Sequence, residues 1–353
     1  MNAYSISTRI KIVVLLLIGL FYLTPAGAEE GVGMVTGSKT GTYYQFGKNI
    51  AEVAKPKGVD ILVKDSKGSI DNIKRLNSRE NAAFGIVQSD VLGFLERSKS
   101  AEMQTVAKRL RLIFPFYNEE VHLFANKSIN TFEDLQGKRL VVGEKESGNW
   151  LTSTNLLEMT GVEPAEQVYM PPKEAAVAVL KGEVDAMIYV AGKPVTLFTA
   201  LGNLKEKPDF APLFDNIHFV PLEDTIMLRE YAESGIGPED YPWIGAPVST
   251  IAVKAVLMSF DFSSKRSAYF QQRCQDLAGI GQAIRANIDQ LKKTGHPKWN
   301  EVDLDAEVGN WQRDTCSQSA ETGAKGSKTD ISKELEKLLL NQLILKQGVA
   351  LVN

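Results

Sequence analysis

The sequence predicts an α/β fold with two domains, each a mostly parallel sheet flanked by helices. The chain has 353 residues, 44% hydrophobic and 24% charged, which is typical of a globular protein but too long for one compact core. Strands, glycine-bearing loops and helices also follow one another repeatedly, as in βα units. The formal net charge of −3 provides no basic surface for nucleic acid, so we expect no nucleic-acid partner.

Residues 1–28 are expected to be a secretory signal peptide rather than part of the fold. Arg9 and Lys11 precede an apolar run at 12–23 that is short for a membrane span. The segment 24–28 then ends in Ala-Gly-Ala, with small residues at the −3 and −1 positions of a cleavage site. No cysteine follows the apolar run, so we expect an exported protein without a lipid anchor.

Hydrophobic patterning then places the elements in order. The first series comprises strands at 32–36, 61–63 and 82–87 and helices at 43–54 and 69–77. Two further strands are predicted at 110–116 and 121–125. The second series comprises strands at 139–142 and 186–190 and helices at 149–159 and 173–180. A strand at 248–253 and a long helical region at 263–316 complete the pattern, and we expect the chain after about 220 to return to the first domain.

The two cysteines, Cys274 and Cys316, predict one disulfide, because an isolated pair in an exported protein is commonly oxidised. Two unrelated thiols are the alternative. Neither a CxxC motif nor a nearby histidine pair indicates zinc, so we expect no metal and no cofactor.

Catalysis has little support in the sequence. The three histidines are His122, His218 and His296, and none lies in an HExxH motif or beside a GxSxG motif. His122 lies in an alternating strand pattern, which favours a structural role. We therefore expect a binding protein rather than an enzyme, with an exported hydrolase using His122 or His218 as an alternative.

Two glycine-bearing loops precede helices, one in each predicted domain, at 37–42 and 146–149. Such loops present backbone N–H groups and the positive end of a helix dipole to an anion. The first loop resembles a nucleotide phosphate loop but fails on glycine spacing, so nucleotide is not expected. Further polar residues at helix starts or strand ends are Ser69, Asn72 and Gln88. With Lys39 as the one cation, this set suits a small acid; helix capping is the alternative role of each Ser or Asn.

Six short motifs occur in order within 31–316. They are Gly-Ser-Lys-Thr-Gly-Thr-Tyr-Tyr at 37–44, Gly-Ser-Ile-Asp-Asn at 68–72, Val-Gln-Ser-Asp at 87–90, Glu-Ser-Gly-Asn at 146–149, Gly-Glu-Val-Asp-Ala at 182–186 and Gly-Lys-Pro at 192–194. In these motifs the sequence resembles the TAXI-type substrate-binding proteins of tripartite ATP-independent periplasmic (TRAP) transporters.

The resemblance implies a two-lobed periplasmic-binding-protein fold, type II-like, with a hinge between the lobes. Lobe I is expected to comprise 29–125 and 220–316, and lobe II 126–219. Residues 317–353 are expected to be a polar linker and a helical tail. The tail's apolar side would pack on the protein's own surface or mediate association of an otherwise monomeric protein.

The resemblance also implies a periplasmic receptor that delivers a small organic acid, a dicarboxylate or a glutamate-like molecule, to a TRAP membrane permease. A ligand-binding sensor for a membrane signalling protein is an alternative. The expected ligand-binding residues are Gly37, Ser38, Lys39, Thr40, Gly41, Thr42, Tyr43, Ser69, Asn72, Gln88, Ser147, Gly148, Asn149 and Trp150. Lys39, Asn149 and Trp150 depart from the family pattern; Lys39 would add an ion pair and Trp150 would stack on the ligand or limit its size.

Overall fold

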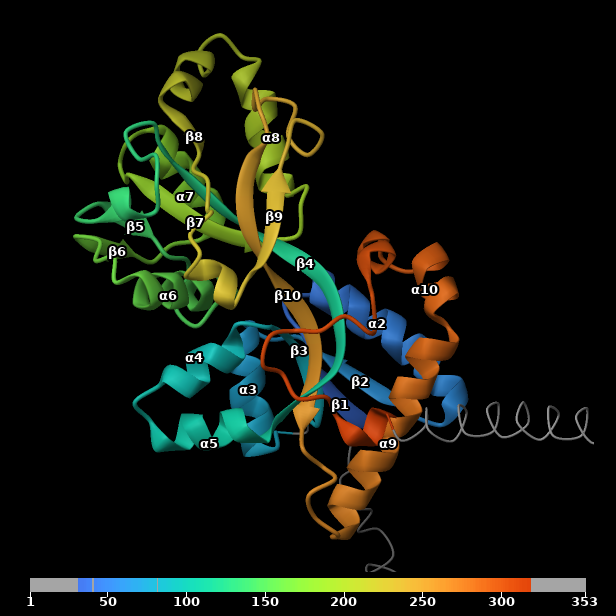
Figure 1. Cartoon of the computed structure of the whole chain (residues 1–353). Helices are drawn as coiled ribbons and strands as arrows, with labels where there is room; N and C mark the ends of the chain where they lie inside the picture. Colours follow the sequence, from blue (N-terminus) through green and yellow to red (C-terminus); the bar gives the residue numbers. More distant parts are fainter. Residues whose placement is uncertain (1–30, 40, 81, 319–353) are drawn as a thin grey trace, which may run out of the picture. The chain divides into compact units, whose positions relative to one another are not determined.

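The computed structural model describes residues 31–318 except 40 and 81. The expected signal peptide and residues 319–353 of the expected tail lie outside this range. The first series of elements comprises β1 (Val32–Val35), α2 (Thr42–Ala54), η2 (Lys55–Lys57), β2 (Ile61–Lys64), α3 (Ser69–Ser78), β3 (Phe84–Gln88), α4 (Val91–Arg97) and α5 (Ala101–Arg109). The strand β4 (Leu110–Asn126) follows it and leads into the second series (Figure 1).

The second series again alternates strands with helices. It comprises η3 (Glu133–Leu135), β5 (Arg139–Val141), α6 (Gly148–Thr160), β6 (Glu166–Val168), α7 (Pro172–Leu180), β7 (Ala186–Ala191), α8 (Thr196–Lys205), η4 (Ala211–Asn216), β8 (Ile217–Phe219), η5 (Met227–Arg229) and β9 (Ala232–Ile236). The strand β10 (Val248–Phe260) then returns toward the first series (Figure 1).

The strands form one mixed sheet in the order β2-β1-β3-β10-β4-β7-β5-β6, with β8 on β4 and β9 on β10. Pairing is parallel at both ends, between β1 and its neighbours β2 and β3, and between β5 and its neighbours β6 and β7. The strand β10 pairs antiparallel with β3 and with β4, and β4 pairs antiparallel with β7. Two parallel sheet ends are thus joined by two long antiparallel strands.

Buried apolar side chains gather in separate cores along these two strands. Residues of β4 up to Tyr117 pack in one core with the first series, and we call this part lobe I. From Val121 onward, β4 packs with the second series, which we call lobe II, where Leu123 and Phe124 enter different cores. That alternation follows from the two-residue period of a strand, which sends neighbouring side chains to opposite faces. The molecule is therefore a two-lobed α/β protein, as predicted.

The crossing between lobes lies inside β4 and β10 rather than between elements. The prediction of two strands at 110–116 and 121–125 is wrong, because β4 is continuous through the polar residues between them. Lys254 of β10 lies at the same crossing and donates from Nζ to Asn118 Oδ1 at 2.6 Å. The β10–β4 register shifts between Lys254 and Val256. The lobe boundaries expected at 125/126 and 219/220 stay a prediction.

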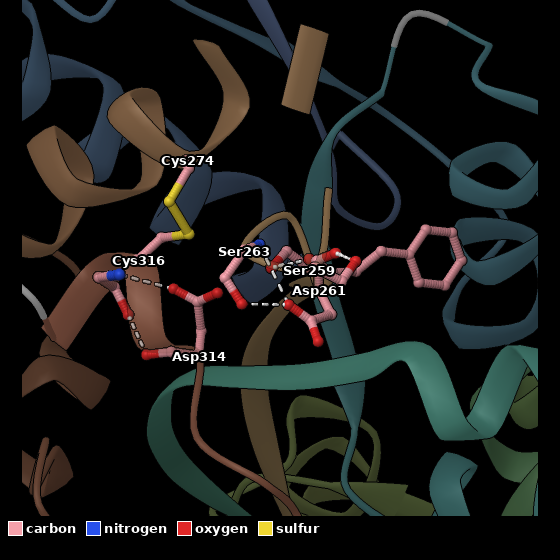
Figure 2. The surroundings of a disulfide bond; sticks show 9 residues. Ser259, Asp261, Ser263, Cys274, Asp314 and Cys316 are labelled. Carbon is pink, nitrogen blue, oxygen red and sulfur yellow. Dashed lines mark hydrogen bonds between the residues drawn. A yellow bond between two sulfur atoms is a disulfide. The ribbon is translucent and has the colours of Figure 1, made fainter. Parts of the chain in front are cut away.

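After β10 the chain forms α9 (Ala268–Ala286), α10 (Ile288–Thr294) and the 3₁₀ helix η6 (Pro297–Glu301). The helical region expected at 263–316 is thus interrupted at 302–314, and residues 315–318 are helical again. The predicted disulfide is confirmed: Cys274 of α9 bonds Cys316 (Figure 2). In the range 31–318, apart from 40 and 81, we find no helix long and apolar enough to cross a membrane.

Candidate functional site

A cavity of about 370 Å³ lies between the lobes. Both lobes contribute to its lining, mostly through loops and helix starts. The lining residues are Gly37, Ser38, Gly41, Thr42, Tyr43, Gly68, Ser69, Gln88, Tyr117, Glu119, Ser147, Gly148, Asn149, Pro172, Tyr189, Val190, Ala191 and Gly192. Among the described residues that line it, only Glu119 has a charged side chain.

Lobe I directs the starts of α2 and α3 at the cavity. Both helices begin after a glycine, Gly41 and Gly68, which has no side chain to cap the first N–H groups. Gly68 has φ of 120°, in the region that favours glycine. The Ser69 hydroxyl accepts a hydrogen bond from Gln88 N at 3.0 Å and so ties α3 to the end of β3. These helix starts place backbone donors and positive dipole ends beside the cavity.

Lobe II directs the start of α6 at the same cavity. Ser147 caps this helix by accepting from Trp150 N at 3.2 Å. Asn149 Oδ1 accepts from Val190 N at 2.8 Å, which fixes the helix start to the end of β7. Gly148, the first residue of α6, lies against the Gln88 side chain of lobe I; a Cβ on Gly148 would lie 2.8 Å from Gln88 Cδ. The starts of α3 and α6 therefore meet from opposite lobes.

The side-chain oxygen of Gln88 is a hydrogen-bond acceptor without a donor in the described part of the chain. The side chain is buried, and its Oε1 has no hydrogen-bond partner within the described residues. A buried polar atom without a partner is costly, because it has given up its hydrogen bonds to water. The Gln88 amide therefore lies at the cavity lining with one acceptor unpaired among the described residues.

Glu119 was missed by the sequence analysis. Its carboxylate accepts from the Tyr43 hydroxyl at 2.9 Å and from the Tyr117 hydroxyl at 3.2 Å. Burial raises the pKa of Glu119 to about 7, although both hydroxyls oppose the shift. Burial also raises the pKa of each tyrosine well above its usual value, so both stay protonated donors. The sequence signal was the polar run 118–120 inside an apolar strand, at the point where β4 changes lobes.

Most of the residues expected to bind ligand do line the cavity. Those that do are Gly37, Ser38, Gly41, Thr42, Tyr43, Ser69, Gln88, Ser147, Gly148 and Asn149. Lys39 is exposed and does not line it, and Thr40 lies outside the described residues. Asn72 is fully buried and donates to Thr36 O and Ile86 O, both at 2.7 Å, so it joins β1 to β3.

Trp150 also lies away from the cavity lining. Its ring packs edge-on against Phe94 of α4, with ring centroids 5.6 Å apart. It therefore contacts lobe I through a helix, rather than through the ligand cavity.

The histidines considered for catalysis are engaged elsewhere. His122 Nε2 lies 2.9 Å from the Tyr241 hydroxyl and Nδ1 lies 3.0 Å from Glu120 O, and burial lowers the pKa of this histidine to about 4. His218 Nε2 lies 2.7 Å from Ile129 O. Neither residue lines the cavity. No group of three or more His, Cys, Asp or Glu in the described ranges could hold a metal ion.

Comparison with protein families supplies an assignment. A model described as the NMT1-like family matches residues 34–270, about two thirds of the sequence. The chain belongs to the NMT1-like family. No curated protein matches the sequence of this NMT1-like protein.

Several solved structures are distantly similar to this NMT1-like protein. One is the GluR0 ligand-binding core from Nostoc punctiforme in complex with L-glutamate, at 13% identity, TM-score 0.42, and coverage of 74% of this chain and 98% of that one. A putative periplasmic sulfonate-binding protein from Methylobacillus flagellatus has 13% identity, TM-score 0.42, and coverage of 75% and 70%. A putative L-cystine ABC transporter from Listeria monocytogenes has 16% identity, TM-score 0.41, and coverage of 80% and 99%.

Proposed function

We propose that this protein is a solute receptor that captures a small organic acid, of the glutamate-like α-amino acid type, between its lobes. The opposed starts of α3 and α6 carry this proposal. They approach so closely that a Cβ on Gly68 would lie 3.6 Å from Gly148 N. Two positive helix ends at this separation repel each other, and an anion held in the cavity beside both ends removes the repulsion. A ligand carboxylate would therefore hold the two lobes together.

The rest of the lining favours an α-amino acid over a plain dicarboxylate. Glu119 and the free Gln88 Oε1 both accept hydrogen bonds, and a ligand ammonium group donates three. The helix starts would bind a ligand carboxylate, and these two acceptors would bind the ammonium group of the same ligand, so an α-amino acid matches both parts of the lining.

The proposal includes export and a membrane partner. The sequence of residues 1–28 supports a periplasmic location after removal of a signal peptide. The six motifs shared with TAXI-type proteins support delivery to a TRAP permease. Transport of this kind would continue when cellular ATP is depleted and would stop when the ion gradient is collapsed. The opposite pattern of uptake would contradict a TRAP partner.

Ligand chemistry is tested with matched probes on protein purified as residues 29–353. We expect L-glutamate to raise the melting temperature and to bind about tenfold or more tightly than glutarate, which lacks only the amino group. The difference reflects a charge-assisted hydrogen bond of about 1.5–3 kcal/mol to Glu119. Isothermal titration calorimetry measures both affinities.

The variant Glu119→Gln provides the control. It keeps an oxygen that accepts from the tyrosines but removes the charge, so its preference for L-glutamate over glutarate should largely disappear. Equal or tighter binding of glutarate by the wild type would overturn the α-amino acid assignment. A broad panel of organic and amino acids that produced neither heat nor a melting shift would overturn the receptor function itself.

A further inference from the structure

A buried contact joins α6 of lobe II to α4 of lobe I, one helical turn from the ligand cavity. Leu151 of α6 is fully buried and belongs to the core of lobe I rather than lobe II. The edge-on pair of Trp150 and Phe94 adjoins it. We call this the α4–α6 contact. The same helix that presents Gly148 and Asn149 to the cavity is thus seated on the opposite lobe.

A single carboxylate lies at the centre of the α4–α6 contact. Asp90 follows β3, immediately before α4, and is 3% exposed. Its Oδ2 accepts from Thr152 Oγ1 of α6 at 2.8 Å and from the Tyr231 hydroxyl at 3.1 Å. Asn155 Nδ2 of α6 donates to Asp90 O at 3.1 Å. Three groups of lobe II therefore converge on one residue of lobe I.

Charged groups surround this centre without pairing with the carboxylate. Arg97 of α4 donates from Nη2 to Asn155 Oδ1 at 2.7 Å and also pairs with Glu230. Asp90 Oδ1 has no partner among the described residues. Burial raises the pKa of Asp90 to about 6, and the hydrogen bonds from Thr152 and Tyr231 oppose this shift. The hydrogen bonds from these two hydroxyls therefore reduce the cost of burying the carboxylate.

Asp90 is also linked to the cavity along the chain. Two residues before it, Gln88 lies against Gly148, the first residue of α6. Thr152 lies four residues after Gly148, on the same side of the helix. The segment from Gln88 to Asp90 therefore contacts two successive turns of α6, the first at the ligand cavity and the second at the carboxylate.

We propose that Asp90 is a positioning residue for ligand capture: by accepting from Thr152 and Tyr231, it holds α6 on lobe I and sets the place of the α6 start at the cavity. This inference rests on the proposed function for its link to ligand. The interlobe contact itself is independent of which ligand binds.

Thr152→Val tests the proposal, because it removes one donor at nearly constant shape. We expect amide hydrogens in the segment 148–156 to exchange about tenfold faster. Loss of a hydrogen bond to a charged group makes local opening of the helix at least about tenfold more frequent. Binding of L-glutamate should weaken by a similar factor. Tyr231→Phe, which removes the other donor, should act in the same direction.

Two matched variants separate positioning from general destabilisation. Thr160→Val makes the same substitution on the same helix, where the hydroxyl donates to Leu156 O and accepts from Val162 N, and should leave exchange in 148–156 unchanged. Thr152→Ser keeps a hydroxyl and should restore both readouts. Exchange within twofold of wild type in both Thr152→Val and Tyr231→Phe would overturn the proposal. If the wild type binds no L-glutamate, the proposed ligand fails, while the exchange comparison still decides the role of Asp90.

Discussion

At the residue scale, Glu119 brings an ionisable carboxyl group into the cavity, and its titration should be visible in stability. Its folded pKa of about 7 lies above the usual 4.5. The folded state therefore binds the proton more tightly, and this contribution is fully present below about pH 4.5 and lost as the pH rises through 7. We expect the wild type to lose up to about 3 kcal/mol relative to Glu119→Gln between pH 4.5 and 8, measured by urea unfolding.

A difference between wild type and Glu119→Gln that stays constant with pH would contradict the raised pKa of Glu119.

At this scale the sequence identified backbone sites better than side-chain sites. Glycine loops before helices predicted the donors near Gly41 and Gly148, because that pattern depends only on local chain geometry. Glu119 was missed because its position depends on β4 continuing from one lobe to the other. Lys39 stood out by its charge in a glycine loop, but charge alone does not fix the direction of an exposed side chain.

At the element scale, the meeting of α3 and α6 requires a glycine at the start of α6. A methyl group in Gly148→Ala would overlap the Gln88 side chain and displace it from the cavity. We therefore expect about tenfold weaker binding of L-glutamate, of the order of a lost hydrogen bond and its disturbed neighbours, with little change in melting temperature. Calorimetry and thermal unfolding measure the two effects separately.

Gly245→Ala is the matched control, because a Cβ there would meet nothing within 4 Å. It should change neither affinity nor melting temperature appreciably. Unchanged affinity in Gly148→Ala would show that Gln88 can move without cost and would contradict its role in the site.

Helices and short strands were predictable because their patterns are local. α3 starts at Ser69 as expected, and α6 begins within one residue of its predicted start. β4 was divided in two because the residues from Asn118 to Glu120 interrupt its apolar pattern. That interruption arises from the change of lobe, where a strand leaves one core before entering the next, and no local rule distinguishes it from a loop.

At the scale of the whole molecule, two lobes followed from chain length and from the repeated βα pattern. The order of the strands in the sheet and the direction of their pairing did not follow from either. Parallel pairing is typical of βα repeats, but the joining of both ends through antiparallel β4 and β10 depends on contacts between distant parts of the sequence. The C-terminal end of the described range shows the same dependence, because Leu112 of β4 accepts from Asp314 N and donates to Gln312 O, both at 2.8 Å.

The disulfide also links that C-terminal end covalently to lobe I. It joins Cys274 of α9 to Cys316, 42 residues apart, just after the segment that pairs with Leu112. In the chain-entropy model, closing such a loop stabilises the folded protein by about 3–4 kcal/mol. We therefore expect reduction to lower the melting temperature of the wild type by several degrees. The double variant Cys274→Ala/Cys316→Ala should melt at the lower temperature with or without reductant. Intact mass after alkylation counts the free thiols, and two free thiols before reduction would contradict the bond.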